Sequence, residues 1–161
     1  CCGKGIASGF PLSAGIGNEE IMDLPEVGNM SSTHSANPIV CVAGMATLNE
    51  IDRLKLVSET NRKGLIFHQR LNDLKKKYPE HISFVLGKGL LAALIFKLPN
   101  NNKPDTFLPS IISEKAMQKG LLVVHTGRES IKLAPPLTIT DDALLEGVKV
   151  LGDSISEVLK I

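Results

Sequence analysis

A lysine between two glycines is the first residue whose type and setting suggest covalent chemistry. Lys4 lies between Gly3 and Gly5 in the segment CCGKGIASGFPL. Neither glycine has a side chain that would block a bulky planar ligand, and a lysine amine forms a Schiff base with a carbonyl cofactor. A loop lysine between flexible glycines explains the same spacing. The residues alone leave both interpretations open.

A second polar stretch, SSTHSANP, occupies residues 31–38. Hydroxyl groups and backbone N–H groups just before a helix N-terminus form an anion site, because the helix dipole and the unpaired N–H groups favour phosphate there. A capping loop rich in Ser, Thr and Asn has the same composition. The pattern therefore indicates either a phosphate site or a helix cap.

The elements that must position these residues follow from the apolar pattern. A short strand is expected over 13–17, and a helix should begin at Pro38 with Asn37 as its cap. Up to Asp52 this helix is apolar on almost all sides, which predicts burial; it then becomes amphipathic and ends at Tyr78. The remaining predictions are two strands within 81–96 joined at Gly87–Gly89, a helix over 110–119 closed by Gly120, strands over 121–124 and 130–134 around a turn, and a last helix capped by Thr140. This order predicts a small α+β domain with an antiparallel sheet and helices on one face.

Composition narrows the function classes. The 161 residues suit one domain, or one domain with a remnant of another, and a 4% aromatic content without Trp requires an aliphatic core. A net charge of +1 gives no electrostatic case for nucleic acid or an anionic membrane. We expect neither a signal peptide nor a membrane span. Three cysteines form no disulfide framework or zinc pattern, and their odd number favours a reducing, cytoplasmic setting.

Four segments resemble, in the same order, the class III aminotransferases of the ornithine and 4-aminobutyrate type. They are GKGIASGFPLSAGIG around Lys4, STHSANPIVCVAGMATL, FVLGKGLL and SIKLAPPLTI. The resemblance implies the C-terminal part of an α/β, fold type I transferase dependent on pyridoxal 5′-phosphate (PLP). It also implies that residues 1–52 are a remnant of the PLP-binding large domain, with the cofactor lysine and a buried helix. Residues 53–161 would then be the small α+β domain.

The same resemblance implies the roles of three site residues. Lys4 would hold PLP as a Schiff base and, once displaced by the incoming amine, move a proton as general base and acid. Thr33, with Ser32 as the alternative, would bind the cofactor phosphate of the neighbouring subunit. This arrangement implies a homodimer with active sites at the interface.

Lys132 departs from the family pattern. Many members have an arginine at this position of the L-R-L-x-P-P-L-x-I stretch, where it clamps the substrate carboxylate in a bidentate fork. A lysine cannot reproduce that fork, although it can hold a carboxylate more loosely. Arg128, four residues earlier, is a candidate substitute. Lys132 as an ordinary surface residue of a strand stays an equal alternative.

The expected function is therefore transfer of an amino group from an amine or amino acid to a 2-oxo acid or aldehyde. In the family, a carboxylate on the pyridine nitrogen, an aromatic residue stacked on the ring and a phosphate loop lie upstream of the lysine. We find none of them here, so we expect no activity from this chain alone. The alternatives are a non-catalytic dimerisation domain or truncated remnant, and an aminomutase, decarboxylase or other fold type I activity.

Overall fold

The computed structural model describes residues 1–160 and divides the chain into two compact units, Cys1–Leu56 and Val57–Ile161. This division falls close to the predicted boundary after Asp52. That the first unit is a remnant of a PLP-binding domain stays a prediction. Within the described residues, every helix is too short or too polar to span a bilayer.

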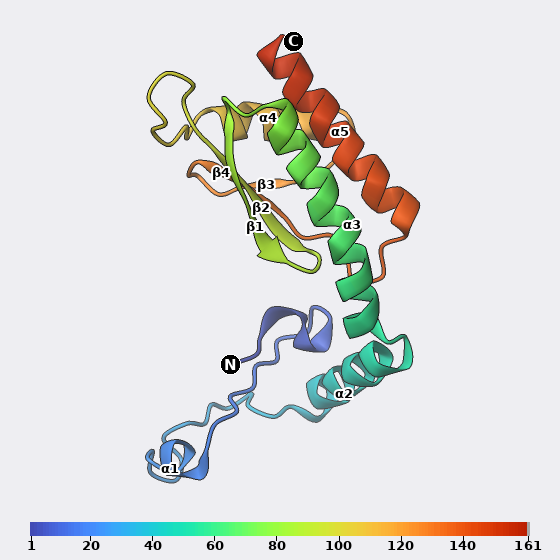
Figure 1. Ribbon diagram of the computed structural model, residues 1–161. Coiled ribbons are helices and arrows are strands. Elements are labelled where there is room, and N and C mark those ends of the chain that lie inside the picture. The colour runs from blue at the N-terminus through green and yellow to red at the C-terminus, as the bar shows by residue number, and fades with distance from the viewer. Residues whose placement is uncertain (161) are drawn as a thin grey trace. The chain divides into compact units, whose positions relative to one another are not determined.

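The first unit is built on one long helix. Its elements are a 3-10 helix η1 (Lys4–Ala7), a short helix α1 (Glu19–Met22) and the helix α2 (Pro38–Arg53) (Figure 1). The predicted start of α2 is confirmed, because Pro38 takes the first turn and the Asn37 side chain accepts a hydrogen bond of 3.0 Å from the Ile39 backbone N–H. The helix ends at Arg53 with Leu54 as its C-cap, and a left-handed Lys55 (φ 51°) separates it from the next helix.

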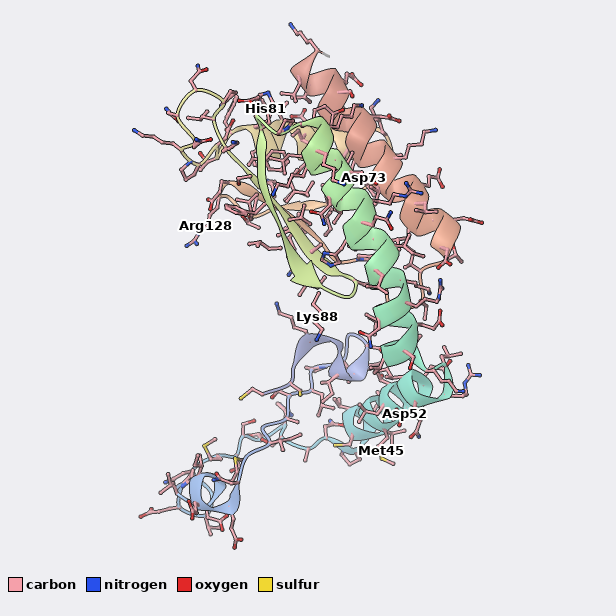
Figure 2. All side chains as sticks on the ribbon, in the orientation of Figure 1. Met45, Asp52, Asp73, His81, Lys88 and Arg128 are labelled. Atoms are coloured by element: carbon pink, nitrogen blue, oxygen red, sulfur yellow. The ribbon has the colours of Figure 1, made fainter. Side chains whose placement is uncertain are left out.

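The prediction that α2 is buried on all sides does not hold for the described residues. Val40 and Gly44 are buried, but one long side of the helix is exposed and apolar. That side consists of Ile39, Val42, Met45 and Leu48, with 52–72% of each residue exposed. Figure 2 labels Met45 on this helix. The physical reason is that η1 packs along the opposite side of α2, so only one face is covered within this unit.

The second unit is a mixed α/β domain. Its elements are α3 (Leu56–Lys77), β1 (Ile82–Lys88), β2 (Leu91–Phe96), α4 (Leu108–Gln118), β3 (Val124–His125), β4 (Ser130–Leu133) and α5 (Asp141–Leu159) (Figure 1). The strand order is β1-β2-β4-β3, and all three pairings are antiparallel. The predicted hairpin and antiparallel sheet are confirmed.

Three helices cover one face of this sheet, as the sequence predicts. The buried cluster joins side chains of α3, α4 and α5 to the inward residues of β1, β2 and β4. Its fully covered members include Leu71, Leu94, Ile112, Ile131 and Ile155. Because these aliphatic side chains come from every layer, burial of their surface supplies most of the driving force for folding this unit.

The other face of the sheet is open, and β1 contributes unexpectedly to it. Simple alternation would place Ile82, Phe84 and Leu86 on the same side. In the structure Ile82 is 1% exposed, whereas Phe84 and Leu86 are 58% and 52% exposed. The register against β2 shifts between Ile82 and Phe84. An irregularity of this kind moves the following residues to the opposite face.

The strand predicted over 121–124 is displaced, and β3 begins only at Val124. The cause lies in the end of α4. Gly120 is left-handed (φ 86°), and the Leu121 N–H donates to the Ala116 carbonyl, which is the hydrogen bond of a Schellman motif. Leu121 therefore belongs to the helix termination and is not available for a sheet ladder.

Candidate active site

Lys4 begins a tight turn, and the chain segments on either side of this turn are joined by one antiparallel β-bridge. The backbone N–H of Cys2 donates to Ala14 O (2.7 Å), and the N–H of Ala14 donates to Cys2 O (2.9 Å). This single bridge replaces the strand expected over 13–17. Both ends of the turn, Lys4 (φ 51°) and Ser8 (φ 50°), adopt the left-handed conformation that non-glycine residues rarely occupy. Such strained residues concentrate at functional sites.

The surroundings of Lys4 fit a planar aldehyde cofactor. Lys4 is exposed, and so are its two neighbours. A Cβ atom built on Gly3 or on Gly5 would find no other atom within 4 Å, so the space beside the lysine is open on both sides. A bulky ring can therefore approach the amine without a steric barrier from the adjacent chain.

The turn packs on the middle of α2, a contact that the local sequence pattern does not predict. Ala7 is 0% exposed, and the Ser8 and Thr47 hydroxyls are 3.0 Å apart. Gly44 of α2 lies under the turn, since a Cβ there would be 2.6 Å from Leu12 Cδ2. An isolated glycine inside an otherwise helical pattern was the available signal for such a close approach.

No hydrogen bond joins Thr33 or Ser32 to Lys4 among the described residues. Thr33 and Ser32 precede the N-terminus of α2, whereas the turn that begins at Lys4 contacts the middle of α2 through Ser8 and Thr47. The Ser32 and Ser35 hydroxyls are within hydrogen-bonding distance of each other at 3.1 Å. Thr33 is exposed, and among the described residues its hydroxyl has no hydrogen-bond partner. Thr33 is thus the freer of the two hydroxyls for an external ligand.

Lys132 lies on the open face of the second unit's sheet. It alternates with the buried Ile131 and Leu133 along β4, and its strand neighbours are Ala93 and Val124. Lys132 is exposed, so its ammonium group presents a positive charge on this face. This setting suits a carboxylate ligand electrostatically.

Arg128 occupies the turn between β3 and β4, not the sheet itself. Gly127, with φ 73°, allows that turn to form. Figure 2 shows the Arg128 side chain projecting outward from this turn. Arg128 and Lys132 therefore belong to different parts of one hairpin.

The comparisons with known proteins identify the family to which a chain with this fold belongs. The model of the family "Aminotransferase class-III" matches residues 1–155. The chain belongs to this family.

Relatives and solved structures agree with that assignment. The mitochondrial acetylornithine aminotransferase of Saccharomyces cerevisiae is 30% identical over 155 residues, 96% of this chain and 34% of that protein. The 4-aminobutyrate aminotransferase of Mycobacterium bovis is 33% identical over 153 residues, 94% of this chain and 34% of that protein. An amine transaminase from an uncultivated Pseudomonas species, solved in its PLP-bound form, superposes with a TM-score of 0.75 at 27% identity, over 81% of this chain and 30% of its own. The chain thus spans about a third of the length of the relatives it matches.

Proposed function

We propose that this chain supplies the cofactor lysine and the small domain of a PLP-dependent aminotransferase. The observation that carries the proposal is the exposed Lys4 amine, held in a strained turn with open space on both sides. The reaction is transfer of an amino group from an amine or amino acid to a 2-oxo acid or aldehyde. Because the chain spans 34% of its relatives' length, we expect the 161 residues alone to be inactive.

In this proposal Lys4 has two tasks. Its Nζ would hold PLP covalently and, when free, would carry a proton to and from the substrate Cα. The bound cofactor supplies the electron sink for that proton transfer. Because Lys4 is exposed, its side chain can change from holding the cofactor to carrying the proton without the movement of another side chain.

Thr33, with Ser32 as the alternative, is proposed to bind the phosphate group of the cofactor that the neighbouring subunit holds. The resemblance to the class III family supports this division, because the matching threonine there reaches the cofactor phosphate of the neighbouring subunit. The exposed apolar side of α2 is consistent with an interface. We therefore propose a homodimer.

Substrate carboxylates are assigned to Lys132, with Arg128 as the substitute. A lysine provides a point charge in place of the arginine fork, so the amino donor need not be an ordinary α-amino acid. The partners are then a small amino donor and an oxo acceptor, without nucleic acid or membrane. We propose a cytoplasmic location from the three free cysteines, although the yeast relative is mitochondrial by name.

The proposal is tested by visible absorbance of the intact protein with PLP. We expect an imine band that is absent in Lys4→Ala, together with loss of amino transfer. Lys103→Ala, at an exposed loop position, is the matched control and should keep the band.

Absence of the band in the intact wild-type protein would leave the non-catalytic dimerisation domain or truncated remnant as the better description. A band without amino transfer to any oxo acid or aldehyde would favour an aminomutase, decarboxylase or other fold type I activity.

A further inference from the structure

The turn that carries Lys4 has few internal restraints of its own. Its backbone hydrogen bonds are short-range, such as Ile6 N–H to Gly3 O (3.3 Å) and Phe10 N–H to Ala7 O (3.1 Å). Lys4 and Ser8 are both held at positive φ without glycine. A strained backbone of this kind persists only where its surroundings over-determine it. The restraint must therefore come from what the turn packs against.

The middle of α2 provides that restraint through one hydrogen bond. The Thr47 hydroxyl donates to the Ala43 carbonyl at 2.9 Å, which turns its oxygen lone pairs toward the Lys4 turn. The Ser8 hydroxyl, 3.0 Å away, can then only be the donor to Thr47. The chain of two hydrogen bonds fixes the C-terminal end of the turn on the helix.

Packing against α2 also holds the Lys4 turn in place. Ala7 is completely buried, and Gly44 allows Leu12 to approach the helix so closely that a Cβ would lie 2.6 Å from Leu12 Cδ2. The Ile6 carbonyl is 3.8 Å from the same point. Hydrogen bond and packing thus act one turn of helix apart on α2, on the same side.

We infer that Thr47 and Gly44 are positioning residues for Lys4. They touch neither the amine nor the space beside it; they act by holding Ser8, Ala7 and Leu12, and through them the backbone angle from which Lys4 projects. The inference rests on the proposed function, because the purpose of fixing Lys4 is its reaction with PLP.

The first experiment needs no cofactor. Thr47→Val in the intact protein keeps the side-chain shape and removes the acceptor for Ser8, whereas Thr47→Ser keeps the hydroxyl. We expect amide hydrogen exchange at Ile6 and Phe10 to be roughly fivefold faster in Thr47→Val than in wild type, and within about twofold of wild type in Thr47→Ser. Ser8→Ala should give the same change, and the double variant should add little to either.

The second experiment reads the chemistry of Lys4. The intact protein is titrated with pH in the presence of PLP, and the imine band is followed. We expect the midpoint to shift in Thr47→Val and to stay at the wild-type value in Thr47→Ser, a difference that a purely structural role would not produce. Exchange rates and midpoints equal to wild type in Thr47→Val would overturn the inference. A wild-type protein without an imine band would instead contradict the proposed function, while the exchange data would still decide whether Thr47 fixes the turn.

Discussion

Lys132 and Arg128 offer two different positive charges on one hairpin, and single substitutions separate their roles. Lys132 is on the open sheet face beside Ala93 and Val124, and Arg128 is in the turn. A guanidinium group placed at position 132 would restore the bidentate fork for a carboxylate. In the intact enzyme, we therefore expect Lys132→Arg to lower the KM for an α-amino acid donor by roughly tenfold.

The matched control is Lys149→Arg, which makes the same change at an exposed position of α5. It should leave the KM unaltered. If Lys132→Arg has no effect and Arg128→Ala raises the KM instead, the carboxylate site belongs to Arg128 and our assignment of Lys132 is wrong.

At the scale of the elements, a close contact between Gly64 and Gly89 joins α3 to the turn between β1 and β2. A Cβ on Gly64 would lie 2.6 Å from Gly89 Cα and 2.9 Å from Gly89 C. Both obstructing atoms are backbone, so no side-chain rotation can relieve the overlap. We expect Gly64→Ala to lower the free energy of unfolding by about 1–3 kcal/mol, measured by urea denaturation.

Gly147→Ala is the matched control, because it also replaces a glycine inside a helix. Its Cβ would meet Leu121 Cδ1 at 3.5 Å, an ordinary contact. The gain in helix propensity should then stabilise the protein by up to about 1 kcal/mol. Equal effects of the two substitutions would show that the contact between Gly64 and Gly89 is not the constraint we describe.

The elements illustrate what a sequence can and cannot predict. Asn37 with Pro38, Gly120 and Thr140 are local signals that act within one turn of chain, and each one marks the helix end observed in the structure. The open side of α2 and the reversed face of Phe84 were not predictable in this way. Both depend on what lies across from the segment, namely η1 in one case and the shifted ladder with β2 in the other.

The candidate site also combines features that local sequence signals predict with features that depend on tertiary contacts. Lys4 and Thr33 stand in recognisable segments, so their positions in the turn and before α2 could be predicted from the sequence. The contact of the Lys4 turn with Thr47 could not be predicted from the sequence. It joins Ser8 to Thr47, which are 39 positions apart, and no local pattern encodes such a contact. The conformation of the Lys4 turn thus depends on tertiary packing.

A carboxylate shared by two lysines ties α4 to α5 and makes stability depend on pH. Glu157 lies 2.8 Å from Lys119 Nζ and 2.9 Å from Lys115 Nζ. Hydrogen bonds from Lys119 and then Lys115 lower the pKa of Glu157 from its ordinary 4.5 to about 2. The stabilisation is therefore complete above about pH 4.5 and is lost as the pH falls toward 2.

Thermal melts at several pH values check this linkage. Between pH 4.5 and 2, we expect the Tm of Glu157→Gln to fall less than that of wild type, and added salt to shrink the difference because the group is exposed. Glu146→Gln, an exposed position on the same helix without an ion pair in the described residues, should follow wild type. Parallel curves for Glu157→Gln and wild type would refute the linkage.

At the scale of the whole molecule, nearly all of the hydrophobic core belongs to one unit. Every member of the buried cluster lies between Phe67 and Ile155. The buried apolar side chains of the first unit, within the described residues, are Ala7, Val40 and Leu56. A small unit with so little buried apolar surface cannot offset the conformational entropy lost on folding.

We therefore expect residues 57–161 to fold when expressed alone, and residues 1–56 to remain unfolded. Far-UV circular dichroism should show helix and strand with one cooperative thermal transition for the longer segment, and neither feature for the shorter one. Leu94→Ala in the longer segment removes a side chain that is 0% exposed and should lower the free energy of unfolding by about 2–5 kcal/mol. A longer segment that melts without cooperativity would mean that its core is completed by residues outside it, and the two units would then have to be treated as a single folding unit.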